Sequence, residues 1–200
     1  MAKVHISSGN MKVGKLPNMS LAPGKSCTKC ACETCLKDCY AMKSYRMYPG
    51  TKNAWDENTE IALSNPGKIE KELNLYLAKK KPELFRIHVA GDFITKEYAA
   101  MWARVVKANP NVRFLAFTKA WDNIRDIDWP TNISIVLSGW PGTKVPEDLK
   151  EKYPVAWMDD GSEGAVDTKK TVLNCPGNCE TCGMCWELYK TNCDVCFKKH

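Results

Sequence analysis

Short apolar segments alternate with longer amphipathic segments along most of the chain. The amphipathic segments carry apolar residues three and four positions apart, which is the spacing of one helix face. Such helices are predicted after Asn65–Pro66, where asparagine caps and proline opens the first turn, and after the capping residue Thr95. A further helical region at 40–64 is interrupted at Pro49–Gly50. Strands are predicted at 19–21, 84–90, 112–118, 133–138, 155–158 and 171–173.

Strands that alternate with helices predict an α/β domain whose strands run parallel. Six strands are too few for a complete eight-stranded barrel, so a partial barrel and an open sheet are the two alternatives. In both architectures the carboxyl ends of the strands carry the chemistry. We therefore expect both cysteine-rich stretches and four polar pairs to gather at one face. The pairs are Gly91–Asp92, Thr118–Lys119, Ser138–Gly139 and Asp159–Asp160.

The composition is that of an ordinary globular protein, with 44% hydrophobic and 26% charged residues in a chain of 200. No apolar run is long enough to span a membrane, and the start lacks the apolar core of a signal peptide. We therefore expect a cytoplasmic protein with no membrane partner. The net charge of +6 rests mainly on lysine, with only five arginines. Because base recognition relies on the arginine fork, sequence-specific nucleic-acid binding is disfavoured, while weak binding to a phosphate backbone stays open.

Eleven cysteines are confined to two short stretches of the chain. In a reducing compartment such clustering indicates metal binding rather than disulfides. Two or three residues between thiols allow one loop to wrap one metal centre, whether zinc or iron–sulfur. The candidate ligands are Cys27, Cys30, Cys32, Cys35 and Cys39 in the first stretch, and Cys175, Cys179, Cys182, Cys185, Cys193 and Cys196 in the second.

Three features favour iron–sulfur clusters over zinc. None of the three histidines lies in a cysteine group, although zinc sites often include histidine. The run Cys175-x3-Cys179-x2-Cys182 supplies three thiolates, which leave one iron of a cubane open to another ligand. Eleven cysteines also suit two clusters with four ligands and one with three. We therefore expect three [4Fe–4S] clusters, with zinc as the alternative cofactor.

Two motifs resemble those of the radical S-adenosylmethionine (SAM) superfamily. Cys32-x2-Cys35-x3-Cys39 follows the first predicted strand, as the three-cysteine loop of that superfamily does, although its two intervals are reversed. Ala90-Gly91-Asp92-Phe93 follows the second strand, where the superfamily has a turn that holds the methionine part of SAM and usually contains glutamate. The resemblance implies a partial (β/α)6 TIM-like barrel with the cysteine-rich loops at the carboxyl-terminal face of the strands.

Four further segments resemble radical-SAM-like proteins of phages, including the phage gene-product-88-like family. They are Cys39-Tyr-Ala, Val89-Ala-Gly-Asp-Phe93, Phe117-Thr-Lys119 and the run Cys175-Pro…Cys-x2-Cys-Gly-x-Cys-Trp186. This resemblance spans most of residues 17–186. If the protein is phage-encoded, we expect it in the cytoplasm of a bacterial or archaeal host.

The resemblance implies that Cys32, Cys35 and Cys39 hold a cluster whose open iron binds SAM, with Gly91 and Asp92 beside the SAM amino group. The alternative for the loop is a closed cluster with Cys27 or Cys30 as its fourth ligand. The alternative for Asp92 is that it caps the helix that starts near Thr95. In the second stretch we expect one closed auxiliary cluster on Cys175, Cys179, Cys182 and Cys185. A further cluster on Cys27, Cys30, Cys193 and Cys196 would join the two chain ends.

Two other polar residues have competing interpretations. Lys119 either meets a carboxylate or phosphate of a substrate or is a solvated lysine. His88 alternates with apolar neighbours, so we expect a core histidine rather than a ligand.

We expect residues 1–170 to form the partial barrel with its first cysteine loop at 27–39, and residues 171–200 to form a cysteine-rich segment packed on the barrel mouth. The expected function is that of a radical SAM enzyme of unknown substrate, small-molecule or macromolecular. It would need an electron donor such as a ferredoxin or flavodoxin. The alternatives are an iron–sulfur protein for electron transfer or redox sensing and a zinc-stabilised nucleic-acid-binding module.

Overall fold

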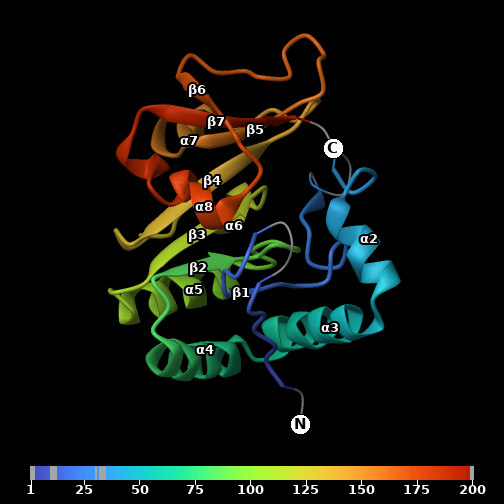
Figure 1. Cartoon of the computed structure of the whole chain (residues 1–200), viewed down its shortest axis with the longest axis vertical. Coiled ribbons are helices and arrows are strands. Elements are labelled where there is room, and N and C mark those ends of the chain that lie inside the picture. The colour runs from blue at the N-terminus through green and yellow to red at the C-terminus, as the bar shows by residue number, and fades with distance from the viewer. Residues whose placement is uncertain (1–2, 10–12, 30, 32–34, 199–200) are drawn as a thin grey trace.

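A parallel sheet of seven strands, in the order β1-β2-β3-β4-β5-β7-β6, forms the centre of the molecule (Figure 1). The structure, a computed structural model, describes residues 3–9, 13–29, 31 and 35–198. Every neighbouring pair of strands in the sheet is parallel, and β1 and β6 form its two open edges. The strands are β1 (Asn18–Met19), β2 (Leu84–Ile87), β3 (Arg113–Thr118), β4 (Ile133–Gly139), β5 (Val155–Asp159), β6 (Thr171–Asn174) and β7 (Cys193–Lys198).

The helices begin and end where local sequence signals predict. The side chain of Asn65 accepts a hydrogen bond from the backbone nitrogen of Lys68, and that of Thr95 accepts one from Tyr98. Pro49 starts a new helix, so the interruption expected there is confirmed. The helices are α2 (Tyr40–Met47), α3 (Pro49–Ser64), α4 (Pro66–Lys80), α5 (Lys96–Ala108), α6 (Trp121–Ile124), α7 (Glu147–Lys152) and α8 (Cys179–Cys182), with 3-10 turns η1 (Met184–Trp186) and η2 (Leu188–Lys190).

Two apolar cores lie on opposite faces of the sheet, because alternate residues of a strand point to opposite sides. On one face Phe85 packs against Trp102 of α5 and Phe114 of β3, in a core shared with helices α3, α4, α5 and α7. On the other face Leu115 and Val136 pack against Trp186. Helices therefore cover the first face, whereas the segment that joins β6 to β7 covers the second and lies over β3 and β4 (Figure 1).

The α/β class and the parallel direction of the strands are confirmed. The prediction missed β7, which lies between β5 and β6 and contains Cys193 and Cys196. Their clustering predicts metal ligands, but cysteine also behaves as a small apolar residue, and Cys196 here lies between Val195 and Phe197 in a strand. Because β6 and β7 belong to the same sheet as the other strands, residues 171–198 extend the sheet at its edge and also cross its second face.

The second strand is shorter than predicted and ends at Ile87 instead of residue 90. His88 has a left-handed backbone conformation, with φ of 58°, and this conformation cannot continue a strand. The loop that follows His88 carries Gly91 and Asp92. Among the described residues, no helix is both long enough and apolar enough to cross a membrane.

Candidate metal centre

The second cysteine stretch begins directly after β6 and forms a tight, locally capped turn. The backbone nitrogen of Cys175 donates to the carbonyl of Cys196 on β7 at 2.7 Å. The side chain of Asn178 then accepts hydrogen bonds from the backbone of Glu180 and Thr181, which starts the single turn of α8. Gly183 ends that turn with φ of 61°, a conformation that glycine adopts without strain. Four cysteines thus lie within eleven residues, from Cys175 to Cys185, around this turn.

Contacts on three sides hold this turn against the sheet. Trp186 and Leu188 are buried in the core of the second face. Glu187 accepts a hydrogen bond from Arg113 of β3 at 2.6 Å. Glu180 accepts one from the backbone nitrogen of Lys15 at 3.2 Å, which ties the turn to the segment before β1. The position of the cysteines is thus set by partners elsewhere in the chain.

The thiol of Cys185 is influenced electrostatically by the other three cysteines of this turn. The pKa of Cys185 is raised to about 12, mainly by burial and further by the neighbouring thiols of Cys175, Cys179 and Cys182. A neutral thiol at physiological pH would release its proton only when a metal replaced it. Cys175 is exposed and the other three are half-buried. Within the described parts of the chain, no three histidine, cysteine or acidic side chains converge closely enough for a single metal ion.

Arg86 of β2 points into this group of thiols. Its neighbours Phe85 and Ile87 belong to the helix-covered core, so strand alternation directs Arg86 to the second face. Its Nη1 donates to Sγ of Cys179 at 3.7 Å, and its guanidinium carbon lies 4.8 Å from the ring centroid of Phe117. Its Nε is shielded from solvent and has no hydrogen-bond partner among the described residues. Sequence analysis missed Arg86, although a charged residue within an apolar strand was a visible signal.

The first cysteine stretch lies beside the carboxyl end of β2. Cys27, Cys35 and Cys39 are half-buried, whereas Cys30 and Cys32 lie outside the described residues. Cys39 precedes the first residue of α2, and Sγ of Cys27 accepts a hydrogen bond from the backbone of Gly24 at 3.3 Å. The expected grouping of Cys32 with its neighbours therefore has no geometric test here.

Tyr40 links the two cysteine stretches. The residue is 43% exposed, while its hydroxyl donates a hydrogen bond to the carbonyl of Val89. Burial raises the pKa of Tyr40; the charge of Arg86 opposes this, and Cys39 and Cys179 add to it. One hydroxyl is thus under the influence of both stretches, although they are far apart in the sequence.

Cys193 and Cys196 do not form a pair of neighbouring ligands. They are three residues apart on β7, so their side chains lie on opposite faces of the strand. Cys193 packs against the core of the second face. Cys196 is buried and pairs in register with Trp157 of β5 and Asn174 of β6. A cluster held by Cys27, Cys30, Cys193 and Cys196 would need the last two thiols on the same side of β7, and the structure places them on opposite sides.

Gly91 and Asp92 lie in the loop after β2, as predicted, and are tightly packed. A Cβ atom on Gly91 would lie 2.5 Å from Oγ of Ser26 and 2.6 Å from Cβ of Leu21. The two carboxylate oxygens of Asp92 accept hydrogen bonds from Phe93 N at 2.7 Å, Thr118 Oγ1 at 2.6 Å and Lys119 N at 2.8 Å. Burial raises the pKa of Asp92, and these hydrogen bonds oppose the rise. The alternative role as a helix cap was wrong, because Thr95 caps α5.

Lys119 is buried, so its interpretation as a solvated lysine was wrong. Its ammonium lies 4.8 Å from the ring centroid of Trp140. It lines a cavity of about 310 Å³ together with Thr28 and Lys29 of the first cysteine loop and residues 120–123. Two of the four polar pairs expected at one face meet here, where Asp92 contacts Thr118 and Lys119.

His88 is buried, as expected for a core histidine. Its Nε2 lies 3.0 Å from the hydroxyl of Tyr98, and the two rings stack with centroids 5.6 Å apart. Burial lowers the pKa of His88 to about 3. The ring is therefore neutral in the folded protein at physiological pH.

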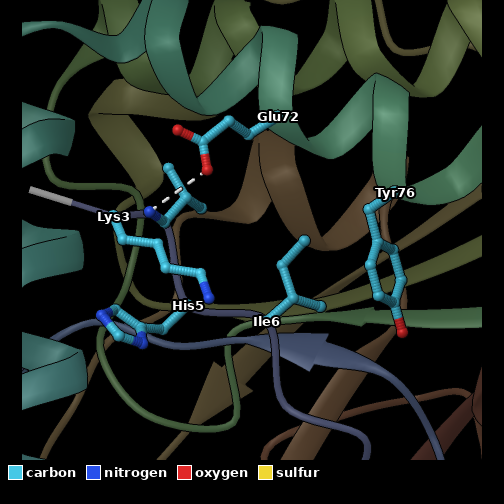
Figure 2. A pocket seen from close by; sticks show the side chains of 6 residues that line it. Lys3, His5, Ile6, Glu72 and Tyr76 are labelled. Atoms are coloured by element: carbon cyan, nitrogen blue, oxygen red, sulfur yellow. Dashed lines mark hydrogen bonds between the residues drawn. The ribbon is translucent and has the colours of Figure 1, made fainter.

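A second cavity of about 320 Å³ lies between the amino-terminal segment and α4 (Figure 2). Its lining includes His5, Ile6 and Tyr76, and the backbone nitrogen of Val4 donates to Glu72 at 3.3 Å. No predicted site residue lines this cavity, so we place the candidate site at the cysteines.

Comparison with known proteins identifies the family. A family model described as Gene product 88 matches residues 3–196. The chain is similar to the Gene 88 protein of Mycobacterium phage L5, with 28% identity over 214 residues that cover 91% of this chain and 88% of the relative. It is also similar to the Gene 88 protein of Mycobacterium phage D29, with 32% identity over 212 residues and the same coverage. No solved structure matches the chain.

These matches confirm the resemblance to phage proteins. The name of the family and the names of the two relatives state no cofactor or reaction. Membership of the radical SAM superfamily therefore stays a proposal. Since the family model covers nearly the whole length, the chain belongs to the gene product 88 family.

Proposed function

We propose that this protein is an iron–sulfur protein of the radical-SAM-like type, with three [4Fe–4S] clusters on its two cysteine stretches. Its open parallel sheet would then be a partial (β/α)6 barrel with one further strand. The observation that carries the proposal is the contact of the Arg86 guanidinium with Cys179, within the run of Cys175, Cys179, Cys182 and Cys185.

Two features of this group support a cluster over a zinc ion. All its candidate ligands are cysteine thiols, whereas zinc sites often include histidine. A cluster with four thiolates carries net negative charge, and Nε of Arg86, which has no hydrogen-bond partner among the described residues, offers it a donor on a cationic group. We therefore favour an iron–sulfur cluster at these cysteines.

Cys175, Cys179, Cys182 and Cys185 would hold a closed auxiliary cluster. In the first loop Cys32, Cys35 and Cys39 would hold the cluster with an open iron. Cys27 and Cys30 are further candidate ligands, and of Cys193 and Cys196, which lie on opposite faces of β7, a third cluster would take only one. When bound, the open cluster supplies the electron that cleaves the sulfonium bond of SAM. A carboxylate has about four acceptor positions, and Asp92 uses three, so it retains one for the SAM amino group beside Gly91. The cavity beside Lys119 would receive the substrate.

A second candidate is an iron–sulfur protein that transfers electrons or senses redox state without SAM. The exposure of Cys175 favours it, since a cluster there would lie at the surface, where a ferredoxin or flavodoxin can approach. As a phage protein it would act in the cytoplasm of its bacterial host. Zinc-stabilised binding of nucleic acid is the third candidate, and metal analysis separates it from the other two.

The test is the metal and sulfide content of the full chain after anaerobic purification, with absorption and electron paramagnetic resonance spectra before and after SAM. The proposal expects about twelve irons and an equal amount of sulfide per chain, three cubanes in all, and a change of the spectrum with SAM. Iron without a response to SAM would favour the electron-transfer protein. Zinc without sulfide would contradict both iron–sulfur candidates.

A further inference from the structure

We infer that Arg86 binds a sulfur of the cluster on Cys175, Cys179, Cys182 and Cys185 and thereby sets its reduction potential. This inference rests on the proposed function, because it requires a cluster at these cysteines. It assigns to Arg86 a positioning and tuning role that no motif in the sequence indicates.

The first argument is the lack of a carboxylate partner. Arg104, Arg113 and Arg125 each form an ion pair with an acidic side chain. Among the described residues no such pair includes Arg86, although its Nε is closed to solvent. Arg86 is half-buried, and a shielded donor such as its Nε is costly to leave without a hydrogen bond. An anionic cluster at the neighbouring cysteines supplies that compensation.

The second argument is the direction of the guanidinium. One donor already points at Sγ of Cys179, at 3.7 Å, and the ring of Phe117 supports the guanidinium at 4.8 Å. Guanidinium donors are fixed in a planar fork, so the bond to Cys179 also directs the remaining donors. The guanidinium thus meets the second cysteine stretch at Cys179, and its Nε is a further donor without a partner among the described residues.

The effect on the cluster follows from charge. Reduction adds an electron, so the reduced cluster is more negative than the oxidised one. Positive charge and hydrogen bonds to sulfur stabilise the more negative state and raise the reduction potential. Removal of the Arg86 side chain should therefore make this cluster harder to reduce, while clusters in the first loop change less.

The test compares Arg86→Gln and Arg86→Lys with Arg104→Gln in the anaerobically purified full chain. Arg104 forms an ion pair with Glu70 at the surface. Arg104→Gln is therefore the matched control, because it also removes one guanidinium but away from the cysteines. Iron and sulfide content are measured first, and then the potentials by redox titration followed by electron paramagnetic resonance. We expect Arg86→Gln to shift one cluster to a more negative potential. We expect Arg86→Lys, which keeps the charge but loses the fork, to give a smaller shift, and Arg104→Gln to give none.

The outcomes separate the two levels of the proposal. A wild-type protein without iron overturns the proposed function and this inference with it. A fully loaded wild type whose potentials are unchanged in both Arg86 variants overturns only the role of Arg86. If Arg86→Gln does not fold, the test uses Arg86→Lys. An unchanged reduction potential in the iron-loaded Arg86→Lys variant would contradict hydrogen bonding from the guanidinium to the cluster.

Discussion

The hydroxyl of Thr118 donates a hydrogen bond to the buried carboxylate of Asp92 at 2.6 Å. This bond joins the loop after β2 to the last residue of β3. The backbone nitrogen of Lys119 donates to the same carboxylate at 2.8 Å, so one side chain sets the spacing of two strand ends. Asp92 thereby positions Lys119 at the wall of the cavity next to the first cysteine loop.

Replacement of this carboxylate by an amide should destabilise the fold. In Asp92→Asn the side-chain amide nitrogen would face at least one of the three groups that now donate to the carboxylate, such as the backbone nitrogen of Lys119. Both groups are then donors, so no hydrogen bond can form between them. A buried donor without a partner costs about 1–3 kcal/mol in the free energy of unfolding. Urea denaturation of the anaerobic protein measures this loss. The control Asp126→Asn removes an exposed carboxylate and should change stability by less than about 0.5 kcal/mol. Equal stabilities for the two variants would contradict this role of Asp92.

A side chain at Gly91 should disturb both the fold and the first cysteine loop. Gly91 has φ of +81°, and its missing Cβ would lie 2.6 Å from Cβ of Leu21. We expect Gly91→Ala to lower the free energy of unfolding by more than about 1 kcal/mol, because strain and a close contact act together. Thermal or urea denaturation measures the change. Gly50→Ala is the matched control, since no atom lies within 4 Å of its added Cβ and alanine favours a helix. An unaffected Gly91→Ala variant would show that the loop moves aside freely.

The stability of the protein should fall in mild acid because of His88. Burial lowers its pKa to about 3, against an ordinary value of 6.5. Between these two values the unfolded chain binds a proton that the folded protein excludes, so stability is complete above pH 6.5 and declines as the pH falls below it. A single group of this kind contributes a loss of about 2 kcal/mol between pH 7 and pH 5.

The variant His88→Asn isolates this contribution. Asparagine tolerates the left-handed backbone that residue 88 adopts, with φ of 58°, and does not titrate. Its stability at pH 7 should be lower, because ring stacking with Tyr98 is lost. Its further loss on acidification to pH 5 should be smaller than that of the wild type by about 2 kcal/mol. Parallel pH profiles of the two proteins would exclude His88 as the source of acid sensitivity.

Loss of one ligand should remove one cluster and leave the others. Under the proposed function, Cys179→Ala should lower the iron content by about four atoms per chain out of about twelve. The neighbouring Thr181→Ala is the control, because its exposed side chain is not a proposed ligand. Iron and sulfide assays on both variants give the answer. Full iron content in Cys179→Ala would mean that Cys179 is not a ligand of an auxiliary cluster.

Local patterns along the chain were sufficient to predict the class of the fold. The caps at Asn65 and Thr95 and the helix interruption at Pro49–Gly50 depend on neighbouring residues only, and each was predicted correctly. The apolar strands predicted a parallel sheet because most of them alternate with helices. The cysteine stretches were equally visible, since their spacing is a local property of the sequence.

The sequence by itself thus determined most of the elements, the parallel direction of the strands and the two groups of candidate ligands. Only the tertiary structure decided that β7 inserts between β5 and β6, that Cys193 and Cys196 face opposite sides, and that Arg86 meets Cys179. It also decided the burial of Lys119. The physical reason is that strand order and side-chain surroundings depend on contacts between distant parts of the chain, and Arg86 and Cys179 are 93 residues apart.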